Sequence, residues 1–294
     1  SPVQVGSDTT WNSFPNNLSA NEATVGAIKT DGTFWVWGSN SYGVLGQNQA
    51  PGTREGYSSP VQLPGSYDKK CIVTNQIALI NSAGELYMAG RNDKGTLGQN
   101  QGYIPGQPQP FRSSPVQIPG NSWANIVIND YAGSAFATKT DGTLWSWGYN
   151  GGNAEGVLGH NNEVNYSSPV QIPGTTWPTA DNKMSAGGRN ASLIKTDGTL
   201  WMIGYNVYGQ LGQNDRASRS SPVQIPGTWE SVNVGQLITF AKKTDGTLWG
   251  WGRADRGSLG QNDNIDRSSP VQIPGTTWGQ AQGGENIGAV FKVQ

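Results

Sequence analysis

The sequence predicts an all-β protein built from repeated small sheets, and three observations support this. Ser-Pro-Val-Gln occurs six times, starting at residues 1, 59, 114, 168, 221 and 269, and a period of about 50 residues is typical of stacked or ring-shaped repeat proteins. An Asp-Gly pair recurs between apolar runs, which indicates tight hairpins. No stretch has the i, i+3, i+4, i+7 apolar spacing of an amphipathic helix. The 42 glycines among 294 residues suit many short strands and turns.

Each repeat presents the same elements in the same order. The repeats run at about 1–58, 59–113, 114–167, 168–220 and 221–268, with a partial sixth at 269–294. In the fourth, the apolar runs 191–195 and 200–204 flank Asp197-Gly198, so we expect two strands joined by a two-residue turn with positive φ. The recurrent Ser-Pro-Val-Gln stretch is expected at a sheet edge, where the missing proline N–H is not needed.

The strand after each hairpin is apolar on both faces. In the first repeat, Trp35 and Trp37 alternate with Phe34 and Val36, and alternate residues of a strand point to opposite sides. Each sheet must therefore be covered on both faces, which either a stack or a closed ring of sheets would achieve. The leucines that follow each hairpin are expected to fill the seams between sheets; they are Leu45, Leu97, Leu158, Leu211 and Leu259.

Residues 187–201 and 37–46 resemble the repeats of the regulator of chromosome condensation (RCC1) family, and the Ser-Ser-Pro-Val-Gln-Ile-Pro-Gly wording resembles bacterial and phage versions. The resemblance implies a β-propeller of four-stranded blades over a single domain, residues 1–294. We expect six blades, the last closed by both termini, because residues 1–5 repeat the edge-strand motif. That blade would lack its third strand. Three explanations stay open: the blade is irregular, a partner supplies the strand, or the chain is a fragment of a longer one.

Residues suited to catalysis or metal binding are scarce. His160 is the only histidine and Cys71 the only cysteine, so a Ser-His-Asp or Cys-His arrangement and a His- or Cys-based metal site all lack members. The hairpin aspartates are explained by turns, and the tryptophans by core packing. We expect no enzymatic activity, cofactor or metal. The net charge of −1, without a basic run, argues against nucleic acid, and no apolar run is long enough for membrane insertion.

The loops of unequal length are the candidate recognition surface. The loop before Ser-Pro has 8 residues in three repeats, but 12 at 47–58 and 15 at 99–113. Tyrosine and arginine dominate recognition surfaces, although long loops also diverge without function. The candidate binding residues of the two long loops are Arg54, Tyr57, Tyr103, Ile104, Phe111 and Arg112.

These features favour a non-catalytic recognition or structural module with a protein partner. We expect a virion decoration or appendage component, or a surface adhesin, placed outside the cell or on a virion surface; assembly with further copies is left open. One alternative is a secreted inhibitor or lectin-like binder. The resemblance implies another, a guanine-nucleotide exchange factor. The family's eukaryotic members often carry histidine seven residues before the hairpin aspartate, where this chain has Thr24, Gln76, Ser134, Asn190 and Ile238.

Overall fold

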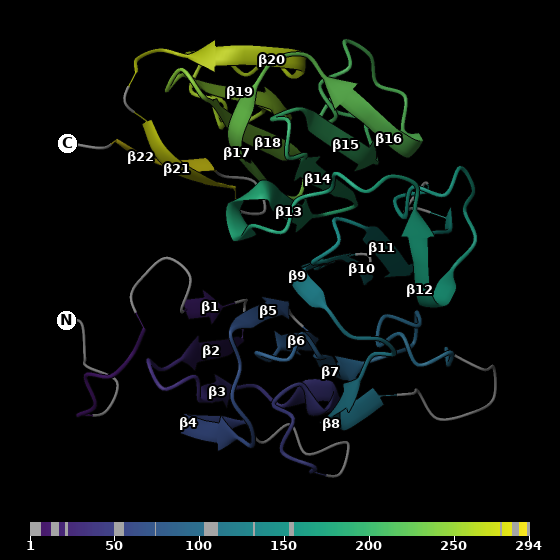
Figure 1. Ribbon diagram of the computed structural model, residues 1–294. Helices are drawn as coiled ribbons and strands as arrows, with labels where there is room; N and C mark the ends of the chain where they lie inside the picture. The colour runs from purple at the N-terminus through teal and green to yellow at the C-terminus, as the bar shows by residue number, and fades with distance from the viewer. Residues whose placement is uncertain are drawn as a thin grey trace. The chain divides into compact units, whose positions relative to one another are not determined.

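The computed structural model confirms the all-β prediction (Figure 1). It describes residues 7–12, 18–20, 23–49, 56–73, 75–102, 111–131, 133–152, 156–276, 278–283 and 288–292. The chain divides into two compact units, Ser1–Asp93 with Tyr103–Ile126, and Lys94–Gly102 with Val127–Gln294. We call them unit 1 and unit 2 and describe each by itself. A single domain over residues 1–294 stays a prediction.

Unit 1 contains two four-stranded antiparallel sheets, each in simple sequence order. The first consists of β1 (Leu18–Ala20), β2 (Thr24–Ile28), β3 (Phe34–Gly38) and β4 (Tyr57–Leu63), with the short 3-10 helix η1 (Ser41–Gly43) after β3. The second consists of β5 (Lys69–Val73), β6 (Gln76–Ile80), β7 (Leu86–Arg91) and β8 (Phe111–Gln117).

Unit 2 repeats the same plan. Its first sheet consists of β9 (Trp123–Asn129, in unit 2 from Val127), β10 (Ser134–Lys139), β11 (Leu144–Gly148) and β12 (Tyr166–Ile172). The second follows the short 3-10 helix η3 (Asp181–Lys183) and consists of β13 (Met184–Gly187), β14 (Asn190–Ile194), β15 (Leu200–Gly204) and β16 (Arg219–Ile225). The third consists of β17 (Trp229–Val234), β18 (Ile238–Lys243), β19 (Leu248–Gly252) and β20 (Arg267–Ile273). The strands β21 (Trp278–Gly283) and β22 (Gly288–Lys292) form a two-stranded sheet. Its closure by residues 1–5 lies outside the described residues and stays a prediction.

The five Ser-Pro-Val-Gln strands that the structure describes lie at sheet edges, as the proline argument requires. Each pairs with one neighbour, and the pairing register shifts at the Ser-Ser-Pro segment, as between Met202 and Gly204 of β15 opposite β16. The extra residues form a bulge, where a proline without an N–H breaks no ladder.

Backbone hydrogen bonds join four of the Leu-Gly corners to the edge strand of the next repeat. The backbone N–H of an asparagine in the corner donates to the carbonyl of the first serine of the motif; the pairs are Asn48–Ser113 (2.6 Å), Asn100–Ser167 (2.7 Å), Asn161–Ser220 (2.7 Å) and Asn214–Ser268 (2.7 Å). All four asparagines have left-handed φ values, between 54° and 61°, which asparagine tolerates better than most residues. The repeated motif therefore ties neighbouring sheets together through the backbone.

The hairpin turns differ in one respect from the prediction. In the first repeat, Lys29 N–H bonds to the Thr33 carbonyl (2.9 Å) and Gly32 N–H to the Lys29 carbonyl (3.0 Å), so the loop has three residues rather than two. Only Gly32 has positive φ, 82°. The Asp31 carboxylate accepts hydrogen bonds from Thr33 N–H (2.9 Å) and hydroxyl (2.7 Å), and that hydroxyl accepts one from Trp35 Nε1 (3.0 Å). Asp31 therefore fixes the strand that follows the turn.

Apolar side chains fill the seams between consecutive sheets, as predicted. In unit 2, one cluster joins β13–β16 to β17–β20 through Leu211, Ile225, Trp229 and Trp251. The Trp229 and Trp251 ring centroids are 5.9 Å apart in an edge-to-face arrangement, and full burial of one large side chain stabilises by about 1.5–3 kcal/mol. All five predicted seam leucines are buried. Within each unit, the sheets are therefore held together mainly by apolar packing.

Candidate recognition site

The loop residues predicted from the sequence are only partly described. Arg54, Tyr103 and Ile104 lie outside the described residues. Tyr57, at the start of β4, packs against the apolar cluster of unit 1, and its hydroxyl accepts a hydrogen bond from Gln49 Nε2 (2.5 Å).

Phe111 and Arg112 are half-buried at the start of β8 and pair with the end of β7. Their role in binding stays a prediction.

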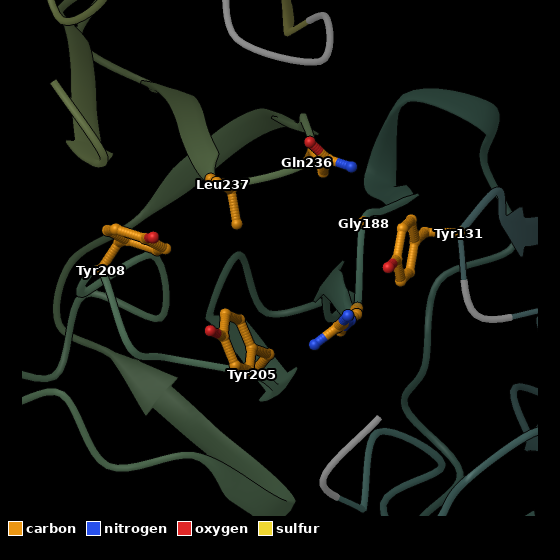
Figure 2. A pocket seen from close by; sticks show the side chains of 7 residues that line it. Tyr131, Gly188, Tyr205, Tyr208, Gln236 and Leu237 are labelled. Atoms are coloured by element: carbon orange, nitrogen blue, oxygen red, sulfur yellow. The ribbon is translucent and has the colours of Figure 1, made fainter. Parts of the chain in front are cut away.

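A hollow of about 200 Å³ lies in unit 2, at the end of the sheets opposite the Asp-Gly hairpins. We call this hollow the Arg189 pocket. It is lined by Tyr131, Gly188, Arg189, Tyr205, Tyr208, Gln236 and Leu237. They come from the β9–β10, β13–β14 and β17–β18 turns and from the loop after β15. Figure 2 shows Tyr131 and Tyr208 on opposite sides of the hollow, with Tyr205, Gln236 and Leu237 between them. Three consecutive sheets thus contribute to one site.

Close backbone contacts hold these turns in place. Gly188 has a φ of 51°, and a Cβ atom at this position would lie 2.2 Å from the Gln236 carbonyl oxygen. Any larger residue would push the β13–β14 and β17–β18 turns apart. The Arg189 carbonyl accepts a hydrogen bond from Tyr205 N–H (3.1 Å), which joins the turn to the loop after β15. Close backbone contacts and a hydrogen bond therefore join the turns and the loop that line the pocket.

The Arg189 guanidinium lies between two tyrosine rings. Its Cζ is 4.6 Å from the Tyr131 ring centroid and 5.3 Å from that of Tyr205, within the range of cation–π attraction. Within the described ranges, no carboxylate lies within ion-pair distance of Arg189. By contrast, Arg253, stacked 5.1 Å from the Tyr208 ring, is paired with Asp255 at 2.5 Å. Arg189 is therefore a positive charge without a carboxylate counter-ion in the described structure.

Pairs of a cation and a tyrosine recur at this end of the sheets. In unit 1, Arg91 lies over Tyr42, with 5.2 Å from its Cζ to the ring centroid. In unit 2, Lys94 lies over Tyr149, with 4.9 Å from its Nζ to the ring centroid. Loop length, the signal used to predict the site, does not reveal these residues. A sequence signal for some of them is the residue that follows the recurring glycine near the end of the third strand, because its side chain varies among the repeats. These residues are Ser39, Arg91, Tyr149, Tyr205 and Arg253.

The remaining reactive side chains have structural surroundings. His160 Nε2 lies 2.9 Å from Ser146 Oγ, its ring packs edge-on against Tyr166, and burial lowers its pKa. Cys71 lies half-buried on β5. Among the described residues no group of three or more His, Cys, Asp or Glu side chains could hold a metal ion.

No helix in the described part of the chain is long and apolar enough to cross a membrane.

Comparison with known proteins identifies the repeat. The family model described as "Regulator of chromosome condensation (RCC1) repeat" matches residues 31–74, 141–189, 197–241 and 245–290. Among curated proteins, the chain is 28% identical over 210 residues to the mitochondrial RCC1 domain-containing protein RUG3 of Arabidopsis thaliana, covering 68% of this chain and 44% of the relative. It is 27% identical over 201 residues to mouse (Mus musculus) Protein RCC2, covering 63% and 36%. The chain thus spans less than half the length of these relatives.

Solved structures show the same fold at low identity. Human WBSCR16 superposes with a TM-score of 0.77 at 18% identity, covering 94% of this chain and 71% of that one. Yeast RCC1 (Prp20), in a structure bound to Kap60, superposes with a TM-score of 0.75 at 16% identity, covering 94% and 66%. The fold is therefore the RCC1-type β-propeller, and the five four-stranded sheets and one two-stranded sheet described here agree with the expected six blades. With matches over more than half of its length, the chain belongs to the regulator of chromosome condensation (RCC1) repeat family.

Proposed function

We propose that this propeller is a non-catalytic module that recognises a partner protein through the Arg189 pocket. The observation that carries the proposal is a hollow lined by three tyrosines, two of which contact an arginine that has no carboxylate partner among the described residues. Tyrosine, tryptophan and arginine supply most of the binding energy at protein interfaces. Tyr131 is 61% exposed, so its ring is available to a partner.

The size of the pocket favours a protein partner over a small molecule. Its volume of about 200 Å³ is below the roughly 300–1,000 Å³ of typical small-molecule sites. A hollow of this size receives a side chain from a larger partner. The family supports this choice, since two yeast structures describe Prp20 bound to Kap60 and Prp20p with binding to Gsp1p and histones.

The proposal is tested by selecting binders from a displayed random-peptide library on the wild-type protein and measuring their affinity for Tyr131→Ala. Loss of a central interface tyrosine costs about 2 kcal/mol, so we expect affinity to fall about 30-fold. Tyr42→Ala is the matched control, because Tyr42 is also exposed and stacked against an arginine but lies outside the pocket. Peptides that bind wild type and Tyr131→Ala equally would contradict the proposal.

The more specific roles, the location and the oligomeric state stay predictions. The relatives give no support to a virion or phage role, and the extracellular or virion-surface placement and assembly into oligomers rest on the sequence arguments alone. The secreted-inhibitor and lectin-like alternatives would be tested on a glycan array. Nucleotide exchange would be tested by measuring nucleotide release from small GTPases; the structural similarity to yeast RCC1 (Prp20) is what supports this alternative.

A further inference from the structure

Resting on the proposed function, we propose that the Arg189 pocket selects an acidic side chain, an aspartate or glutamate of the partner. The pocket places one guanidinium between two aromatic faces and leaves its hydrogen-bonding edge to the ligand. The inference concerns the chemistry of the bound residue and is independent of which protein carries it.

The hydrogen-bonding capacity of Arg189 supports this choice. A guanidinium carries five N–H donors, and among the described residues none of these donors is bonded to a protein acceptor. The contacts with Tyr131 and Tyr205 are cation–π contacts with the ring faces, so the N–H groups along the edge of the guanidinium have no oxygen or nitrogen acceptor among the described residues. Two parallel N–H groups on that edge match the two oxygens of a carboxylate, which is the strongest neutralising partner among protein side chains.

The charges around the pocket favour an anion from outside. Arg253, beside Tyr208, is already paired with Asp255, so this neutralised pair competes little with Arg189 for an incoming carboxylate. Asp130, next to Tyr131 in sequence, is exposed and does not line the hollow. Arg189 is thus the only charged member of the lining, and an incoming carboxylate would neutralise it.

The other lining residues indicate how the acid is presented. Leu237 offers an apolar contact and Gln236 an amide that can donate to a carboxylate oxygen. A partner that covers the hollow would limit access of water to the ion pair, which would strengthen the pair relative to one on an open surface. An extended peptide with an apolar residue next to its Asp or Glu fits this lining.

The test uses the peptides whose binding depends on Tyr131. We expect Asp or Glu at one position in these peptides, and we expect their Glu→Gln or Asp→Asn versions to bind about tenfold or more weakly, because charged hydrogen bonds are the stronger class. In the Arg189→Gln protein the acidic and amide peptides should bind equally. Arg189→Lys should retain only part of the preference, since an ammonium cannot pair in the bidentate manner.

Arg256→Gln is the matched control. Arg256 is exposed in the loop after β19 and lies outside the lining, so its loss removes the same charge without touching the pocket. An unchanged acid preference in Arg189→Gln, or an equal loss in Arg256→Gln, would overturn the inference. Tyr131-dependent peptides without an acid would also overturn it while leaving the proposed function intact, whereas the absence of any Tyr131-dependent peptide would defeat the proposed function itself.

Discussion

The side chain of Asn206 offers a sharp test of how the corners are held. It is completely buried, its Oδ1 accepts Leu211 N–H (2.8 Å), and its Nδ2 donates to the Asp215 (3.1 Å) and Ala217 (3.0 Å) carbonyls. Asn206→Ala leaves the buried Leu211 N–H without its acceptor, at about 2 kcal/mol, and loses the two loop bonds, which water replaces in part, at about 1 kcal/mol more. We expect the free energy of unfolding to fall by about 3 kcal/mol.

The assay is urea unfolding followed by tryptophan fluorescence, with the loss seen as a lower midpoint at an unchanged slope. Alanine fits sterically, since the fifth repeat has the buried Ala254 at the equivalent position. Asn150 makes the same bonds to Leu158 N–H and to the Asn162 and Val164 carbonyls, so Asn150→Ala should cost as much. Asn182→Ala, at an exposed position, should change little. A loss below about 1 kcal/mol for Asn206→Ala would refute the assignment of the corner to this side chain.

Three further predictions use the same unfolding assay. Asn214 has a left-handed φ of 61°. Asn214→Gly should leave the free energy of unfolding nearly unchanged, whereas Asn214→Val should lower it by about 1–2 kcal/mol. Equal effects of the two substitutions would show that the left-handed φ does not determine the residue at this position. Burial lowers the pKa of His160, so the folded state binds a proton there less readily than the unfolded state does. The contribution of His160 to the free energy of unfolding is therefore present above the ordinary pKa of about 6.5 and is lost as pH falls below it. His160→Gln should remove this loss while keeping the fold, as glutamine occupies the site in other repeats. Hydrogen bonds from Thr199 lower the pKa of Asp197, so stability should decline as pH falls below about 3.9, and Asp197→Asn should show less of that decline.

The fold was predictable because its signals are local and repeated. Proline at a sheet edge, glycine at the end of each hairpin and leucine in each seam follow from the chemistry of single residues, and copies of the pattern confirm one another. The three-residue hairpin was missed because Asp-Gly suits both turn types. The hydrogen bonds that distinguish them involve Lys29 and Thr33, on either side of the pair.

The Arg189 pocket was not predictable in the same way. Tyr131 and Arg189 occupy short turns with no repeat signature, and Tyr205 follows a recurring glycine after which the side chain varies among the repeats. The sequence predicts that neighbouring sheets pack together, but it does not state which turns and loops meet. The longest loops stand out in the sequence because loop length can be read along the chain, whereas proximity between distant residues cannot. An arginine without a carboxylate partner can be recognised only when every neighbouring element has been placed.

The amino-acid sequence by itself determined the repeat, the strands and hairpins and the membership of a propeller family. These depend on alternation of apolar residues and on backbone preferences that act within a few residues. Only the tertiary structure decided which turns meet, that Asn206 closes a corner and that Arg189 lies between two tyrosines. The physical reason is that these hydrogen bonds and cation–π contacts depend on how turns and loops from different strands are placed in space, which a repeated pattern of apolar residues does not encode.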